Sequence, residues 1–97
     1  MIAALVEVEL HIPASGSLKA KRSVVKSLIG VLQRELKVSV AEVGHQGLWQ
    51  RTRLGVAIAA GSEVGARKVA QQVEKIVWRE PRVEVVSFSV DVVASEQ

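Results

Sequence analysis

The stretch 4-ALVEVELHIPASGS-17 predicts a strand, a break and the start of a helix, in that order. Apolar residues occupy every second position from Ala4 to Ile12, and a period of two is typical of a half-buried strand. Pro13 and Gly16 then interrupt the pattern, and Ser17 is a residue type that caps helix N-termini. We therefore expect one β-α unit at the start of the chain.

The rest of the chain continues with segments of alternating type. Residues 18–37 carry an apolar stripe at helical spacing, made of Leu18, Val25, Leu28, Ile29, Leu32 and Leu36. A β-branched run at 38–43 and an alternating segment at 52–60 predict two strands around 45-HQGLWQR-51. Ser62 caps a second predicted helix that Pro81 ends, and residues 86–92 predict a last strand with Val86, Phe88, Val90 and Val92 on one side.

The predicted order is βαββαβ, which indicates one α+β domain over residues 1–97. Two right-handed β-α-β crossovers on one sheet produce the ferredoxin-like sandwich, a four-stranded antiparallel sheet with two helices on one face. In that fold the strand order is 4-1-3-2, and the other face of the sheet is open. The polar sides of the strands are expected on this open face: Glu7, Glu9, Arg53, Ser87, Ser89 and Asp91.

Composition excludes several classes of protein. The chain has 97 residues, 48% of them hydrophobic, and no cysteine, so disulfide frameworks, thiolate zinc sites and cysteine nucleophiles are absent. We find no export signal and no uncharged run long enough to span a bilayer, and we expect a cytoplasmic protein without a membrane partner. The absence of asparagine favours a heat-adapted source, although six glutamines weaken that inference. No cofactor is expected.

Basic and polar residues gather at one end of the predicted fold. The loop after the first strand, the hairpin 45–51 and the loop around Pro81 all lie at the same end of a ferredoxin-like sheet. Lysine and arginine in a first helical turn oppose the helix dipole, yet the first predicted helix begins with them. Such an end suits a phosphate or carboxylate. The candidate residues for binding nucleic acid or an anion are Lys19, Lys21, Arg22, Lys26, His45, Gln46, Trp49, Gln50 and Arg51.

Several of these candidates have a structural alternative. At helical spacing Lys19, Arg22 and Lys26 share a solvent-facing stripe, whereas Lys21 falls on the core side and is expected to reach toward the hairpin. The exposed lysines fit an ordinary solvated surface equally well. Trp49 fits either a side chain that caps the open end of the core or one that stacks on a base.

Two further features concern the open face. A metal site at His11, His45 and Glu9 is a weak hypothesis, because the two histidines have no repeated spacing. An ion pair between Glu9 and Arg53 across neighbouring strands is the simpler expectation. An apolar strip is also predicted there, and it suits a homodimer contact or ordinary exposed surface. Its residues are Leu5, Gly55, Ala57, Ala59 and Val93.

Three classes of function remain open. An enzyme has little support, because no G-x-S-x-G, H-E-x-x-H or P-loop motif is present. Acylphosphatases share the predicted fold but rely on an asparagine, which this chain lacks. A dimeric small-ligand regulatory module of the ACT type has the same element order. An RNA-binding protein would have to use the basic end, since the predicted first and third strands carry no aromatic residue for base stacking.

The segments 6-VEVELHIPASGSLKAKRSVVKSL-28 and 38-VSVAEVGHQGLWQRTRLGVA-57 resemble the YlxP-like bacterial family, a small domain of unknown function. The resemblance covers nearly the whole chain, with Gly44 in place of an aspartate before His45. It implies a ferredoxin-like fold, and a role in ribosome maturation or translation, because family genes often lie beside those for translation initiation factor 2 and ribosome-binding factor A. We therefore favour a non-enzymatic factor whose basic end docks on ribosomal RNA or a ribosomal subunit.

Overall fold

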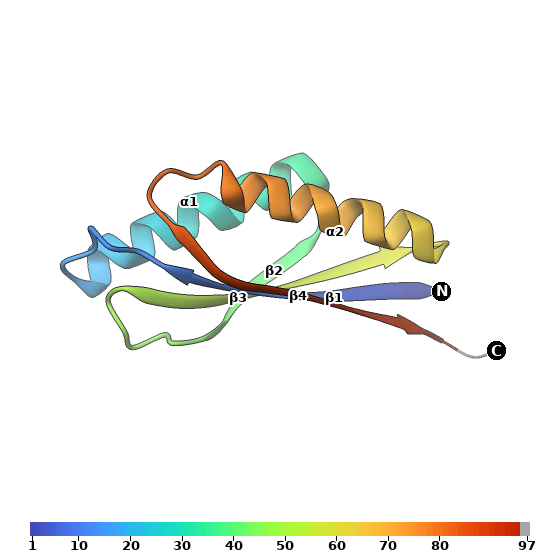
Figure 1. The fold of residues 1–97 in the computed structure, drawn as a ribbon, viewed down its shortest axis with the longest axis horizontal. Coiled ribbons are helices and arrows are strands. Elements are labelled where there is room, and N and C mark those ends of the chain that lie inside the picture. Colours follow the sequence, from blue (N-terminus) through green and yellow to red (C-terminus); the bar gives the residue numbers. More distant parts are fainter. Residues whose placement is uncertain (96–97) are drawn as a thin grey trace.

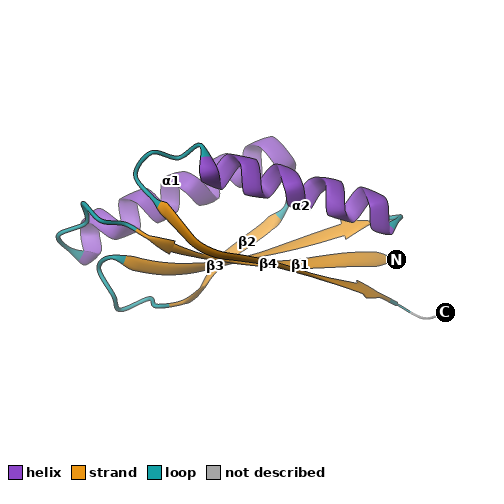
Figure 2. Cartoon of the chain, in the orientation of Figure 1, coloured by secondary structure: helices purple, strands orange, loops and turns teal. Residues whose placement is uncertain are grey.

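The computed structural model describes residues 1–95 and has the predicted order of elements. They are β1 (Ile2–His11), α1 (Leu18–Leu36), β2 (Ser39–Gly44), β3 (Arg51–Ala60), α2 (Glu63–Trp78) and β4 (Glu84–Ala94). The strands form one antiparallel sheet in the order β2-β3-β1-β4, which confirms the predicted topology. Both helices lie on the same side of the sheet (Figures 1 and 2). The other face of the sheet is open.

The helices begin where the capping residues predict. The side chain of Ser17 accepts a hydrogen bond from the backbone N–H of Ala20, and Ser62 does the same for Gly65. These bonds satisfy donors that a helix N-terminus otherwise leaves unpaired. At its other end α1 stops at Lys37, which has left-handed backbone torsions (φ 54°, ψ 41°).

The core lies between the helices and the inner face of the sheet. Every second residue of β1 and β3 is buried there, and the apolar stripes of the helices close over them. The fully or nearly fully buried apolar residues of the strands are Ala4, Val6, Val8, Leu10, Leu54, Val56 and Ile58. No helix within residues 1–95 is long and apolar enough to cross a membrane.

The prediction for the last strand was wrong at one residue. The pairing of β1 with β4 shifts register between Glu9 and Leu10, which face Ser87 and Val85, so Val86 is an extra residue in a β-bulge. A bulge reverses the direction of the side chains that precede it. Val86 is therefore exposed, whereas Phe88, Val90 and Val92 pack against the core as predicted.

Candidate nucleic-acid interface

Lys21 does not belong to a binding surface, although it was a candidate. Its side chain is 0% exposed, and its ammonium group donates to the backbone carbonyls of His45 (2.6 Å) and Gln46 (3.2 Å) and pairs with Glu42 (2.9 Å). The helical stripe placed Lys21 on the core side and predicted that it reaches the hairpin, and this part is confirmed. All three ammonium protons have a partner within the protein, so Lys21 has none left for a phosphate.

Glu42 completes this buried network from the second strand. Its Oε2 accepts a hydrogen bond from the Thr52 hydroxyl at 2.6 Å and forms an ion pair with the ammonium group of Lys21. Thr52 is fully buried. Within residues 1–95, no buried side-chain nitrogen or oxygen lacks a hydrogen-bond partner. The network therefore fixes the hairpin between β2 and β3 to the first turn of α1.

Gln50 attaches the same hairpin to the loop that precedes α1. Its side-chain amide donates to the backbone carbonyls of Pro13 (3.2 Å) and Ser15 (3.1 Å). The backbone carbonyl of Gln50 accepts from the Ile12 N–H (2.9 Å). The amide is thus engaged in holding the two loops together. Gln46, another candidate in this hairpin, also uses its side-chain amide internally, on the carbonyl of Glu42.

The turn itself depends on His45. The Leu48 N–H donates to the carbonyl of His45 at 3.1 Å, and His45 has a left-handed φ of 61°. No glycine in residues 1–95 has a positive φ, so the left-handed position of this turn belongs to His45 and not to Gly47. Lys21 binds the His45 carbonyl on the helix side, which helps to hold this less common conformation.

On the open face the His45 ring meets a charged cluster around Glu9. The carboxylate of Glu9 accepts from His45 Nε2 (2.9 Å), from Arg51 (3.0 Å) and from Arg53 (2.9 Å), which confirms the expected Glu9–Arg53 pair. The hydrogen bond from His45, followed by that from Arg53, lowers the pKa of Glu9 below its usual value. Arg51 and His45 already contact a carboxylate within the protein, so they make weaker phosphate ligands than their position in the sequence indicates.

The two histidines do not share a site. His11 contacts Glu84 at 2.7 Å, whereas His45 contacts Glu9. Among residues 1–95 no group of three or more histidine, aspartate or glutamate side chains is arranged to hold a metal ion. The metal hypothesis for His11, His45 and Glu9 therefore has no geometric support.

The exposed part of the candidate set is smaller and lies mainly on α1. Lys19, Arg22 and Lys26 are exposed and form no ion pair within residues 1–95. The first turn of α1 contains no acidic residue. Trp49 is 55% exposed, so it does not cap the core, and the neighbouring Leu48 is 50% exposed. We call Lys19, Arg22, Lys26 and Trp49 the basic face; sequence reasoning missed Leu48, because a lone leucine in a loop carries no pattern.

The loop after α2 contributes less to this end than its arginines indicate. Arg79 pairs with Glu35 in the last turn of α1, and Arg82 bonds Ser27 in the middle of α1 and Glu80 beside it. Their contacts on α1 therefore lie in its middle and its last turn, and not in its first turn. In Figure 1 the loop lies back from the tip that is formed by the start of α1 and the hairpin. The basic face therefore consists of two segments, not three.

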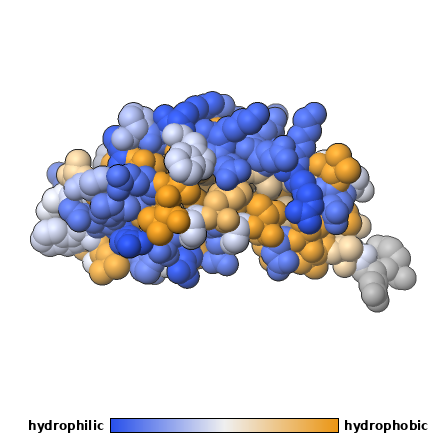
Figure 3. Space-filling model, in the orientation of Figure 1, coloured by the Kyte–Doolittle hydropathy of each residue, from blue (hydrophilic) through white to orange (hydrophobic). Residues whose placement is uncertain are grey.

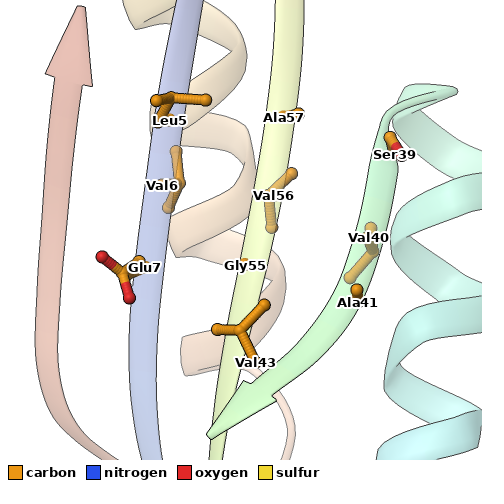
Figure 4. A pocket seen from close by; sticks show the side chains of 10 residues that line it. All are labelled: Leu5, Val6, Glu7, Ser39, Val40, Ala41, Val43, Gly55, Val56 and Ala57. Carbon is orange, nitrogen blue, oxygen red and sulfur yellow. The ribbon is translucent and has the colours of Figure 1, made fainter.

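The open face carries a shallow hollow next to the charged cluster. It has a volume of about 380 Å³ and is lined mainly by apolar residues of β1, β2 and β3. Figure 4 shows Leu5 on β1, Ala57 on β3 and the Val43 side chain lying over β3 next to Gly55. The predicted apolar strip is present, since Leu5 and Val93 are each nearly half exposed. Val43 was missed because a bulge in β2 between Glu42 and Gly44 changes its direction.

Comparisons with known proteins place the chain in a family. Residues 3–90 match the family described as "Protein of unknown function (DUF503)". The chain is 38% identical over 78 residues to the "Uncharacterized protein YlxP" of Bacillus subtilis (strain 168), and the match covers 80% of this chain and 85% of that protein. This agrees with the resemblance in 6–28 and 38–57.

Solved structures with little sequence similarity share the fold. A de novo designed protein with a ferredoxin fold, LFR1 1, superposes with a TM-score of 0.61 at 16% identity, and the match covers 100% of this chain and 91% of that chain. A structural-genomics protein, YJCS, gives 0.54 at 12% identity, with 95% and 99% covered. These two likenesses support the ferredoxin-like architecture and nothing beyond it. The chain itself belongs to the DUF503 family.

Proposed function

We propose that this protein binds RNA through the basic face, and that its target is ribosomal RNA in a small ribosomal subunit. The observation that carries the proposal is a set of exposed cations on α1, Lys19, Arg22 and Lys26, that form no ion pair within residues 1–95. Lys21 ties the same helix to the hairpin that carries the exposed Trp49. The ribosomal target rests on the gene neighbourhood that the YlxP-like resemblance implies.

The charge distribution of α1 favours a polyanion. Each exposed cation that neutralises a phosphate releases a condensed counterion, which favours binding. The only acidic residue of α1 is Glu35, which lies in its last turn and pairs with Arg79. Nothing on α1 itself therefore competes with a phosphate for Lys19, Arg22 or Lys26.

Trp49 supplies the contact that a purely electrostatic surface lacks. An exposed indole offers a flat surface on which an unpaired base stacks, worth roughly 1–3 kcal/mol per base. The hairpin that carries it is held rigidly by Lys21 and Gln50, so little conformational freedom is lost on binding. We therefore expect single-stranded or looped RNA to bind better than a continuous duplex.

The open face of the sheet is a less suitable RNA surface. Its polar part carries Glu7 and Asp91 without an ion-pair partner in residues 1–95, and the charged cluster there already satisfies Glu9 internally. The one phenylalanine, Phe88, packs toward the helices. An RNA backbone would meet unfavourable charge at this face.

Binding to small ribosomal subunits and to rRNA fragments tests the proposal over a salt series. We expect the variant K19A/R22A/K26A to lose at least about tenfold in affinity, and the slope of log affinity against log salt to decrease by roughly two to three. The variant R34A/K68A/K75A is the matched control, because it also removes three positive charges, from exposed residues outside the basic face. Trp49→Ala is expected to weaken binding at every salt concentration.

The control decides how the result is interpreted. Equal losses in the two triple variants would mean that net charge alone attracts RNA, and the basic face would then be no specific site. No binding by the wild-type protein to either target at low salt would refute the proposed function. Lys21 is left intact in all variants, because its removal would damage the fold.

A further inference from the structure

The outer edge of β4 is unusually open to pairing with another strand. β4 has 11 residues and lies at the end of the sheet order β2-β3-β1-β4, with β1 as its only neighbour in the described sheet. Its sequence, 84-EVVSFSVDVVA-94, contains no lysine, arginine or proline, and its pairing is regular from Ser87 to Ala94. The outward backbone N–H and C=O groups along this stretch can bond a further strand.

The opposite edge of the sheet is protected by contrast. β2 has only six residues, and a bulge at Val43 interrupts its pairing. Short strands and bulges are common devices that prevent edge-to-edge association. β4 has its single bulge at Val86, near its start, which leaves eight regular residues without protection.

A groove runs beside this edge between β4 and α2. Phe88 and Val90 form its floor, Arg67 and Glu74 lie at its two ends, Ala70 and Gln71 lie between them, and its volume is about 260 Å³. Figure 3 shows a band of apolar atoms along the middle of this side of the molecule, below a polar upper surface. An incoming strand would therefore cover apolar surface as well as backbone groups.

The two charged residues of this groove favour a second copy of the chain as its occupant. Arg67 and Glu74 are two turns apart on one face of α2 and line the groove together with Phe88 and Val90. Because Ser89 lies between Phe88 and Val90 in the sequence, we take it as the strand position nearest the midpoint of the two charges. A two-fold axis at Ser89 would place Arg67 opposite Glu74 of the partner subunit, and Glu74 opposite Arg67 of the partner subunit. Glu74 forms no ion pair within residues 1–95, and Arg67 has only a loose contact with Glu63 at 3.6 Å.

We propose that a second copy of this chain covers the edge, with the two β4 strands paired antiparallel about Ser89 in one continuous sheet. This register places Ser87 opposite Asp91 of the partner subunit and puts no like charges directly opposite each other. An axis at Asp91 would place two carboxylates in contact. The proposal is independent of RNA binding, because it involves neither α1 nor the hairpin.

The absence of cysteine allows a direct test of the register. At the two-fold axis, paired residues on antiparallel strands have Cα atoms about 4.5–5.5 Å apart, which suits a disulfide. We expect wild-type protein to sediment at twice the chain mass of 10.5 kDa and Ser89→Cys to form a disulfide-linked dimer rapidly on mild oxidation. Ser39→Cys on β2 and Ala57→Cys on the open face are controls that should remain unlinked.

Charge reversal tests the α2 contacts without relying on one variant. Glu74→Arg and Arg67→Glu each create two like-charge contacts, so we expect each to raise the dimer dissociation constant by roughly tenfold or more. The double variant R67E/E74R restores opposite charges and should regain the wild-type constant. A monomer at all concentrations, faster linking of Ala57→Cys, or no recovery in the double variant would overturn the proposal. Faster linking of Ala57→Cys would instead indicate a dimer through the open face.

Discussion

His45 is held from both sides of the sheet by charged residues. Lys21 binds its carbonyl from the helix layer, and Glu9 accepts from its ring on the open face. The residue has left-handed torsions, which are less favourable for a side chain other than glycine. These two contacts explain why a histidine, and not the nearby Gly47, occupies the strained position of the turn.

Replacement of Lys21 by methionine is expected to destabilise the protein strongly. The change removes the ammonium partner of the Glu42 carboxylate and of two backbone carbonyls in a buried site, at a cost of roughly 3–5 kcal/mol. Urea denaturation measures this, with Lys19→Met as the exposed control, for which we expect a change within about 0.5 kcal/mol. The double variant K21M/E42L should recover part of the loss. A single variant as stable as the wild type would show that the network contributes no net stability.

Glu80 is expected to contribute to stability against acid. Hydrogen bonds from Arg82 hold its pKa at about 2, below the ordinary 4.5 of a glutamate. Because the folded-state pKa is depressed, this stabilisation is complete above about pH 4.5 and is lost as the pH falls toward 2.

The free energy of unfolding of Glu80→Gln, measured from pH 7 to pH 2, checks this. The variant should be less stable than the wild type at pH 7, and the difference should shrink between pH 4.5 and 2. Glu7→Gln is the control, because Glu7 forms no ion pair within residues 1–95. A difference between Glu80→Gln and wild type that is the same at every pH would contradict the explanation.

At the scale of the elements, local sequence patterns predict the strands and helices well but miss the two bulges. The caps at Ser17 and Ser62 and the order of elements follow from residue types alone. The direction of Val43 and Val86 does not, because a bulge depends on the pairing with a neighbouring strand. Strict alternation therefore placed Val86 on the wrong face of β4.

The C-terminus of α1 offers a stabilising substitution. Lys37 has φ 54°, a region that glycine occupies without a steric cost, and its N–H caps the carbonyl of Gln33. We expect Lys37→Gly to raise the free energy of unfolding by about 0.5–1 kcal/mol, as measured by urea denaturation. Arg34→Gly, inside the same last turn, should lower it by about 1 kcal/mol. If Lys37→Gly also lowered the free energy of unfolding, the left-handed torsions of Lys37 would not be costing the protein stability.

At the scale of the molecule, hydrophobic periodicity predicts the architecture, because it records which side of each element faces the core. The candidate site is predicted less well. Lys21, His45, Gln50 and Arg51 share one end with Lys19 and Trp49 as expected, but their partners lie on other elements: Glu42, Glu9 and the carbonyls of Pro13 and Ser15. Sequence shows where the polar residues gather, and only the tertiary structure shows which of them are already satisfied.

The two proposed surfaces lie on different parts of the molecule, so variants should separate their effects. α1 packs near β2, whereas β4 and its groove with α2 form the opposite edge of the sheet. We expect K19A/R22A/K26A to keep the wild-type dimer dissociation constant, as measured by sedimentation velocity. The charge-reversed pair R67E/E74R leaves net charge unchanged and should keep the wild-type affinity for RNA. A two-fold axis at Ser89 leaves α1 and the hairpin of each copy free for RNA. If the triple variant raised the dimer dissociation constant by more than about threefold, the basic face would have to reach the dimer contact, and the arrangement about Ser89 would be wrong.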